Sequence, residues 1–244
     1  YIICAFIGSI IFITGFSLLV ELIDRTLRDA YRSRRLTGLP VIAAFNGTNN
    51  LKYRGFLKAC NRRAAAYACQ QINGYLQPNR ATIINLLSIE EREGKSFLAK
   101  YFAQYWESEG LHVRIVNHDI DFEKESKSYV QAQQLSDFWQ LNDAEQQPDI
   151  ILVEYPALCH YDVPEKVLAE SDFNLLVANA ARLWSEKDNA RLRSVKDILK
   201  DKSLYLYLNN ADRETVESFT GELPPHNSVH SFFRRLAQLG LTSQ

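Results

Sequence analysis

The stretch ATIINLLSIEEREGKSFLAKYFAQYW, residues 81–106, decides the fold of this chain. It opens with the apolar run ATIINLL (81–87), whose β-branched residues favour a buried strand. A polar turn, SIEERE, comes next, and residues 94–108 then carry aromatic side chains at helical spacing. The stretch therefore predicts a strand, a tight turn and an amphipathic helix in direct succession.

The same alternation extends along the chain in both directions. Apolar runs predict further strands over HVRIVNH (112–118), DIILVEY (149–155), FNLLVANA (173–180) and LYLYLNN (204–210). Helical patterns cover 51–76, 123–141 and SEKDNARLRSVKDILK (185–200). Strands that alternate with helices predict an α/β fold with a doubly wound, mainly parallel sheet.

An uncharged segment, YIICAFIGSIIFITGFSLLV, occupies residues 1–20. A helix of this length rises about 30 Å, which matches the hydrocarbon core of a bilayer. The next residues, 21–35, are rich in arginine, and arginine beside a span favours the cytoplasmic side. We therefore expect one transmembrane helix over 1–20, with the residues after about 21 facing the cytoplasm. A buried core helix is disfavoured because the segment has no polar stripe.

The sequence divides into three parts on this interpretation. Residues 1–20 form the transmembrane helix, residues 21–50 a juxtamembrane helix and linker, and residues 51–244 the α/β domain. The Gly, Pro and Asn content of 36–50 is typical of a connector. The tail at 224–244 has an amphipathic pattern that predicts a short helix. Because the chain contains no methionine and begins inside an apolar run, we expect it to be part of a longer protein.

Charge and cysteine content disfavour two kinds of partner. The 28 basic and 29 acidic residues give a net charge of -1, so the chain lacks the basic field that binds nucleic acid. The cysteines form no CxxC pair and have no histidine at ligand spacing, so they predict neither a zinc site nor a disulfide framework; they are Cys4, Cys60, Cys69 and Cys159. We therefore expect no nucleic-acid partner, and free thiols in a reducing compartment.

The turn between the predicted strand and helix ends in Gly94-Lys95-Ser96. A Walker A loop also ends in Gly-Lys-Ser or Gly-Lys-Thr. Its glycine lets the backbone amides face the phosphates, its lysine reaches the β- and γ-phosphates, and its Ser or Thr binds Mg²⁺. The tripeptide alone is a weak signal, and its position between a strand and a helix strengthens it. We therefore expect Gly94, Lys95 and Ser96 to form the nucleotide-binding loop of a P-loop NTPase type of fold.

Acidic residues follow two of the predicted strands. Asp119 comes after the strand at 112–118, and Glu154 lies near the end of the strand at 149–155. Open α/β folds bind ligands at this carboxyl edge, and acidic side chains there hold Mg²⁺ or act on the attacking hydroxyl in phosphoryl transfer. We expect Ser96, Asp119 and Glu154 as Mg²⁺ ligands. Asp119 and Glu154 are also the candidate catalytic residues, with solvated loop acids as the alternative.

Three pieces of the sequence together resemble one protein family. They are ELIDRTLR (21–28), LTGLPV (36–41) and the pattern Ser-x5-Gly-Lys-Ser from Ser88 to Ser96. In this order they resemble the bacterial tyrosine kinase and chain-length determinant family, the polysaccharide co-polymerases of capsule and exopolysaccharide export. The resemblance covers the chain up to about residue 212, and the first two pieces are its most specific part.

Membership of this family would imply a protein of the bacterial inner membrane that assembles as a ring-shaped homo-oligomer. The resemblance implies an extracytoplasmic domain before residue 1 and a role in the biosynthesis and export of capsule, exopolysaccharide or lipopolysaccharide. Its implied partners are the polysaccharide polymerase and the outer-membrane exporter. Its implied cofactors are ATP and Mg²⁺.

The sequence departs from the family in the loop. Where the family has Pro and Gly, this chain has Glu91 and Arg92. If Arg92 adopts the left-handed conformation that glycine accepts, the cost is about 1–2 kcal/mol. Glu90, Glu91 and Glu93 also place three carboxylates where a polyphosphate would lie. We therefore expect ATP·Mg²⁺ to bind weakly, if at all.

Other family positions differ as well. The family's Asp-x-Asp-x-Arg motif corresponds here to Asn117, Asp119 and Asp121, and an amide such as Asn117 cannot serve as a general base. Glu154 stands where the family has aspartate. The family's C-terminal tyrosine cluster, the substrate of autophosphorylation, has no counterpart because the last tyrosine is Tyr207. These changes point away from kinase activity.

The sequence thus favours a degenerate member of the family, a membrane-anchored polysaccharide co-polymerase whose kinase-like domain is not catalytic. The alternative is an active ATP-dependent tyrosine autokinase that tolerates the changed motifs and regulates polysaccharide export. A soluble partitioning ATPase, the third hypothesis, is disfavoured by the expected transmembrane helix.

Overall fold

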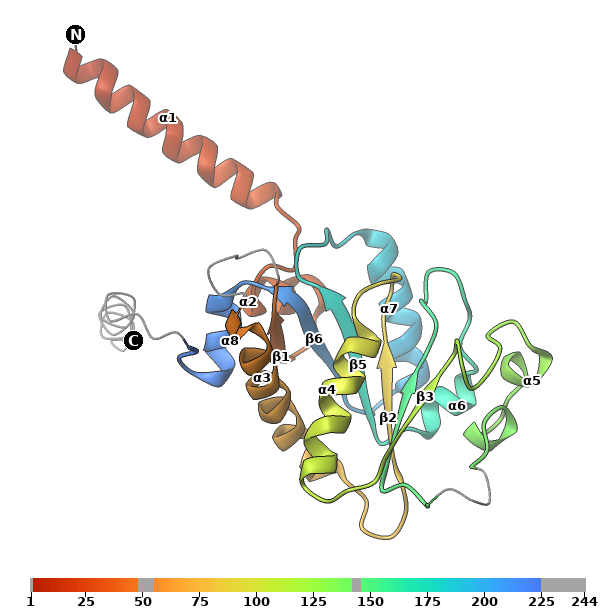
Figure 1. Cartoon of the computed structure of the whole chain (residues 1–244). Helices are drawn as coiled ribbons and strands as arrows, with labels where there is room; N and C mark the ends of the chain where they lie inside the picture. The colour runs from red at the N-terminus through yellow and green to blue at the C-terminus, as the bar shows by residue number, and fades with distance from the viewer. Residues whose placement is uncertain (1, 48–54, 142–145, 225–244) are drawn as a thin grey trace.

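The computed structural model describes residues 2–47, 55–141 and 146–224. Its centre is a six-stranded sheet with the strand order β1-β6-β5-β2-β4-β3 (Figure 1). Neighbouring strands are parallel throughout this sheet, which confirms the expected α/β fold. The strands are β1 (Val41–Asn46), β2 (Thr82–Leu87), β3 (Val113–Asn117), β4 (Ile150–Glu154), β5 (Phe173–Asn179) and β6 (Leu204–Ala211).

Helices cover both faces of the sheet (Figure 1). Parallel crossovers are right-handed, so the direction of each step along the sheet decides the face on which its helix lies. The steps from β1 to β2 and from β2 to β3 place α3 (Leu57–Ile72) and α4 (Lys95–Ser108) together on one face. The steps from β4 to β5 and from β5 to β6 run the other way and place α6 (Glu165–Glu170) and α7 (Glu186–Leu199) on the opposite face.

The central strands are buried on both sides. Every residue of β2 and β4 is buried, as expected of continuous apolar runs in a parallel sheet. From the α4 side, Leu98, Phe102 and Trp106 are buried in the same core. Burial of such side chains contributes about 1.5–3 kcal/mol each, so this layer fixes the strand–turn–helix unit in place.

The order of connections changes direction between β2 and β4. The chain leaves β2 toward α4 on one face and leaves β4 toward α6 on the other. Ligands of open α/β sheets bind outside the carboxyl ends of the strands at such a switch point. The turn that follows β2 therefore lies where the fold favours a ligand.

The expected connector at 36–50 contains a strand of the sheet. Val41–Asn46 forms β1 and pairs with β6, and α8 (Arg213–Thr220) packs beside it. Gly38, one of the residues that predicted a linker, instead caps the C-terminus of α2 (Ala30–Thr37) with φ 67. Burial of the apolar residues of β1 outweighs the turn-forming residues around it.

The expected juxtamembrane helix does not continue the N-terminal helix directly. The N-terminal helix α1 (Ile2–Ile23) ends first, and α2 starts anew at Ala30. The Asp29 side chain accepts a hydrogen bond from the backbone amide of Arg32 at 2.8 Å. This N-cap satisfies an amide that a helix start leaves free, and so defines the boundary.

The segment between α1 and α2 docks onto the α/β unit. Trp184 N donates to Arg25 O at 2.9 Å, and Leu27 N donates to Arg182 O at 3.2 Å. Leu27 is fully buried. The packed unit therefore includes residues before 51, the boundary expected from the sequence.

The helix expected over 123–141 is replaced by two short pieces, α5 (Lys127–Val130) and the 3₁₀ helix η3 (Leu135–Asp137). Ser126 Oγ accepts from Tyr129 N at 3.2 Å, and Asp137 Oδ2 accepts from Gln133 N at 2.6 Å. Short polar side chains that bond nearby amides favour caps and turns over helix interiors. The polar composition was therefore typical of a capped loop.

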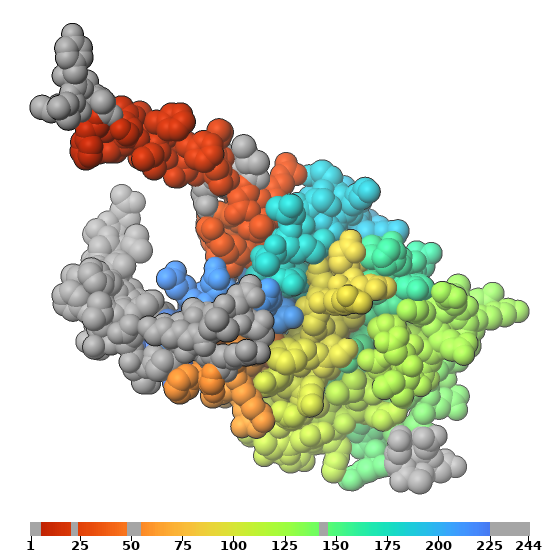
Figure 2. Space-filling view, turned by 45° about the horizontal axis from the view of Figure 1, so that its top comes forward, coloured from red at the N-terminus to blue at the C-terminus, as the bar shows by residue number. Residues whose placement is uncertain are grey.

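The helix α1 extends away from the α/β unit as an arm (Figures 1 and 2). Its apolar side chains are exposed, with Phe12 at 73% and Ile11 at 66%. Among the described residues, however, no helix combines the length and apolarity needed to cross a membrane, so the expected transmembrane helix over 1–20 is not supported. Most of the tail helix expected at 224–244 lies outside the described residues.

Candidate nucleotide-binding site

Two residues with positive φ shape the turn between β2 and α4. Gly94 has φ 101, and a Cβ at this position would collide with the side-chain amide of Asn209. Asn209 Nδ2 in turn donates to the carbonyl of Glu93 at 3.0 Å. Arg92 has φ 58, so it does adopt the left-handed conformation, at a cost of about 1–2 kcal/mol. The turn thus requires glycine at 94 and carries strain at 92.

The N-terminus of α4 opens onto this turn. Its N-cap is Gly94, and no side chain caps the first-turn amides. Those amides and the helix dipole together favour an anion at a helix start. This end of α4, a helix of 14 residues, therefore has the groups that bind a phosphate.

The Lys95 side chain turns back into the loop. Its Nζ donates to Ser88 Oγ at 2.5 Å, and the residue is only 8% exposed. Burial lowers the pKa of Lys95, and the carboxylate of Glu154 is the strongest of the neighbouring charges that oppose this shift. Lys95 is therefore held close to the acids at the strand ends.

Glu154 lies at the end of β4 and is almost completely buried. Its Oε2 accepts from Ser96 Oγ at 2.6 Å and from Asn117 Nδ2 at 3.1 Å. Burial raises the pKa of Glu154, and the hydrogen bond from Ser96 opposes that shift. The arrangement joins α4, β3 and β4 through one carboxylate.

Asp119 lies beyond the end of β3 with its side chain 69% exposed. The His118 ring nitrogen Nε2 is 3.4 Å from Asp119 Oδ1. His118 Nδ1 is 3.3 Å from the carbonyl of Glu154, and burial lowers the pKa of His118. Asp121, which occupies the position of the arginine in the family's Asp-x-Asp-x-Arg motif, does not line the hollow and forms an ion pair with Arg114 at 2.6 Å.

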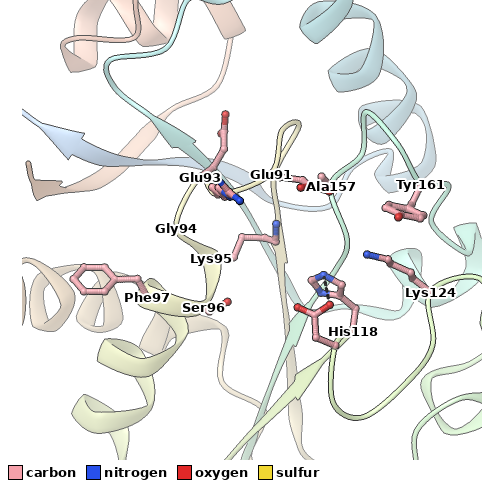
Figure 3. Close-up of a pocket in the computed structure, with 12 residues that line it drawn as sticks. Glu91, Glu93, Gly94, Lys95, Ser96, Phe97, His118, Lys124, Ala157 and Tyr161 are labelled. Atoms are coloured by element: carbon pink, nitrogen blue, oxygen red, sulfur yellow. Dashed lines mark ion pairs between the residues drawn. The ribbon is translucent and has the colours of Figure 1, made fainter.

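These groups border a hollow of about 340 Å³ at the carboxyl edge of the sheet (Figure 3). Its lining includes Gly94, Lys95, Ser96 and Asp119, and adds two residues that the sequence did not single out, Lys124 and Tyr161. Lys124 Nζ lies 4.4 Å from the centre of the Tyr161 ring. Figure 3 shows Lys95 and Lys124 on different sides of the hollow. Their ammonium groups give the hollow positive charge that favours an anion.

A second group of charges lies behind the loop. Glu93 is 2% exposed, and its Oε1 is 2.6 Å from Arg182 Nε without the alignment of a hydrogen bond. Burial raises the pKa of Glu93 to about 7, although Arg182 opposes the shift. Arg182 also pairs with Asp188 at 2.9 Å. The sequence carried no signal for this cluster, because Arg182 comes from the segment after β5.

The structure brings the predicted site residues together. Gly94, Lys95, Ser96 and Asp119 line the hollow, and Glu154 lies beside it through its bond to Ser96. The uncapped start of α4 and the two lysines fit the phosphates of a nucleotide. Ser96, Asp119 and Glu154 have the oxygen ligands that Mg²⁺ prefers. This edge of the sheet thus holds residue types that could take a phosphate and a divalent cation, together with loop carboxylates that would repel a phosphate.

No protein-family model matches the sequence, and no curated protein matches it. Solved structures do match the fold. The kinase domain of the Escherichia coli tyrosine kinase Etk has a TM-score of 0.52 at 12% identity, covering 72% of this chain and 92% of that one. The chimerical protein CapA2B2 has a TM-score of 0.52 at 14% identity, covering 75% and 100%. The tyrosine kinase domain of BceF has a TM-score of 0.49 at 14% identity, covering 75% and 98%. The chain thus has a fold similar to that of a bacterial tyrosine kinase domain.

Proposed function

We propose that this chain is the kinase-like part of a bacterial polysaccharide co-polymerase, which acts in the biosynthesis and export of capsule, exopolysaccharide or lipopolysaccharide without transferring phosphate. The similarity to the kinase domain of Etk supports the kinase-like half of the proposal. The sequence pieces ELIDRTLR (21–28) and LTGLPV (36–41) support the export half. In this role the chain would form a homo-oligomer and contact the polysaccharide polymerase and the outer-membrane exporter.

The main support for the absence of phosphate transfer is the position of Asn117. Phosphoryl transfer to a hydroxyl uses a carboxylate that accepts the proton of the attacking group. At the end of β3 this chain has an amide instead, and its Nδ2 donates to Glu154. Glu154 is further occupied by Ser96. The position that would need a proton acceptor therefore supplies a donor.

ATP·Mg²⁺ is expected to bind the full chain, purified in detergent, with a dissociation constant weaker than about 100 μM, or about -5.5 kcal/mol. The carboxylates of Glu91 and Glu93, which line the hollow, oppose the triphosphate. Titration calorimetry is the direct measurement. A dissociation constant near 1 μM, about -8 kcal/mol, would contradict the degraded-site argument.

Two variants sharpen this titration. Glu91→Gln removes one carboxylate that lines the hollow and is expected to strengthen binding, whereas Lys95→Met is expected to abolish it. If both leave the heat of binding unchanged, the nucleotide is bound elsewhere.

The alternative function is an active tyrosine autokinase. It is favoured by the Ser96–Glu154 hydrogen bond, because a Ser or Thr beside a strand-end acid is the usual Mg²⁺ arrangement of such loops. In that case Lys95 and Ser96 would act on phosphate and metal, with Asp119 and Glu154 around the metal. The amide of Asn117, in place of a carboxylate at the end of β3, weighs against it.

We also propose that α1 attaches the chain to the bacterial inner membrane, with the residues after about 21 on the cytoplasmic side. The exposed apolar side chains of α1 support attachment to lipid, since large exposed apolar patches mark interaction surfaces. The arginine-rich segment after α1 supports the orientation.

Replacement of Ile11 and Phe12 by aspartate is expected to move the expressed chain from the membrane pellet to the supernatant in carbonate extraction. Carboxylates are unfavourable in an apolar lipid environment, and both side chains are exposed on α1. Tyr31→Asp, at an exposed position of α2, is the matched control and should stay in the pellet. Wild-type chain in the supernatant would contradict membrane attachment.

A further inference from the structure

Three side chains of different metal-ligand types meet beside the loop. Glu90 lies in the turn after β2, and Cys159 and His160 lie in the segment after β4. Their ligand atoms all lie within 4.8 Å of one another. Cys159 Sγ is 3.3 Å from Glu90 Oε2. Glu90 and Cys159 are half-buried and His160 is exposed, so an ion has access to the cluster.

The backbone brings these residues together. Leu158 N donates to Ser88 O at 3.0 Å, and Cys159 N donates to Ile89 O at 2.9 Å. These bonds join the two segments just beyond the ends of β2 and β4. His160 N donates to Ala157 O at 3.1 Å and closes a tight turn. Backbone hydrogen bonds thus hold the two segments of the cluster side by side.

We propose that Glu90, Cys159 and His160 form a binding site for a transition-metal ion, best matched by Zn²⁺. A thiolate, an imidazole and a carboxylate are ligands of Zn²⁺, whereas Mg²⁺ and Ca²⁺ take oxygen ligands. On binding, the metal replaces the thiol proton of Cys159, and that proton passes to solvent. Water takes the fourth position of the tetrahedron.

The distances suit this ion after a small adjustment. Zn–S bonds of about 2.3 Å and Zn–N or Zn–O bonds of about 2.0–2.1 Å place tetrahedral ligands about 3.3–3.6 Å apart. The Cys159–Glu90 pair is already at 3.3 Å. The widest separation within the cluster, up to 4.8 Å, must close by about 1 Å, a motion that the exposed His160 side chain can make.

This site is distinct from the nucleotide hollow but shares its loop. Glu91, the neighbour of Glu90, lines the hollow, as do Ala157 and Tyr161 on either side of the other two ligands. A bound ion would therefore link the turn after β2 to the segment after β4. Zn²⁺ binding at this site requires neither phosphate transfer nor membrane attachment.

The test is a titration of the full chain, freed of metal by a chelator, with ZnCl₂ in a calorimeter and with CoCl₂ in a spectrophotometer. One ion per chain is expected, and Co²⁺ should show a thiolate-to-cobalt charge-transfer band. Cys159→Ser and His160→Ala should each weaken Zn²⁺ binding by more than about tenfold, since loss of even an outer-shell partner costs about 10–100-fold. Cys159→Ser should also remove the charge-transfer band.

Cys60→Ala and His112→Ala are the matched controls. Cys60 lies in α3 and His112 before β3, away from the cluster, so both variants should bind like the wild type. A second readout needs no variant, because Zn²⁺ should protect Cys159 of the wild type from alkylation, as mass spectrometry can measure. The proposal is overturned if no ion binds, if binding survives both ligand substitutions, or if Zn²⁺ leaves the alkylation of Cys159 unchanged.

Discussion

Gly94→Ala is expected to lower the free energy of unfolding by about 2–5 kcal/mol. Two effects add. The left-handed backbone at φ 101 costs a residue with a Cβ about 1–2 kcal/mol. The new methyl group also collides with the Asn209 side-chain amide, and overpacking of this kind costs about 1–3 kcal/mol. Urea-induced unfolding measures the change as a shift of the midpoint.

Two matched variants separate the effects. Gly110 has φ 86 with nothing within 4 Å of a Cβ, so Gly110→Ala reports the backbone cost alone. Asn209→Ala removes the colliding amide, and in that background Gly94→Ala should cost about as much as Gly110→Ala. This double-mutant cycle measures the collision as a coupling energy. The geometry of the loop is wrong if Gly94→Ala costs no more than Gly110→Ala in the wild-type background.

Glu93→Gln is expected to stabilise the chain increasingly as pH rises from 5 to 8. Burial raises the pKa of Glu93 in the folded chain to about 7, above its ordinary value of 4.5. A carboxyl group with a raised folded pKa binds more protons in the folded state, so its contribution is fully present below about pH 4.5 and is lost as pH rises through 7. Glutamine has no charge to lose.

The expected size follows from that shift. About 2.5 pKa units correspond to about 3.4 kcal/mol over the whole titration, and about 2.5 kcal/mol of this falls between pH 5 and pH 8. The unfolding free energy of Glu93→Gln relative to the wild type should rise by that amount over this range. Urea unfolding at several pH values gives this difference. Glu91→Gln corrects for the loss of one charge at an exposed position of the same loop. A difference that stays constant over this pH range would mean that the pair with Arg182 keeps Glu93 ionised throughout.

The strands and the loop were predictable because their signals are local. The runs at 81–87 and 149–155 are continuously apolar since β2 and β4 are buried on both faces. Gly94-Lys95-Ser96 was recognisable from its place between strand and helix. Asp119 and Glu154 could be placed at one edge because parallel strands end together.

The remaining features depend on contacts that are distant in the sequence. The strand Val41–Asn46 was hidden between Gly38 and other turn residues, and only its pairing with β6 identifies it. The ion pair of Glu93 with Arg182 joins segments with no shared motif. For the same reason, Cys159 and His160 gave no ligand spacing, because Glu90 lies 69 residues away.

The proposed function excludes phosphate transfer by this kinase-like fold. Tyr207 is fully buried in β6, where a phosphate would be costly.

The most direct measurement is therefore autophosphorylation. The full chain with α1 is expressed, incubated with ATP·Mg²⁺ and probed with an anti-phosphotyrosine reagent, beside an active tyrosine kinase and the Lys95→Met variant. We predict no signal from the wild type. A tyrosine phosphorylation signal that disappears in Lys95→Met would contradict the account and establish the autokinase instead.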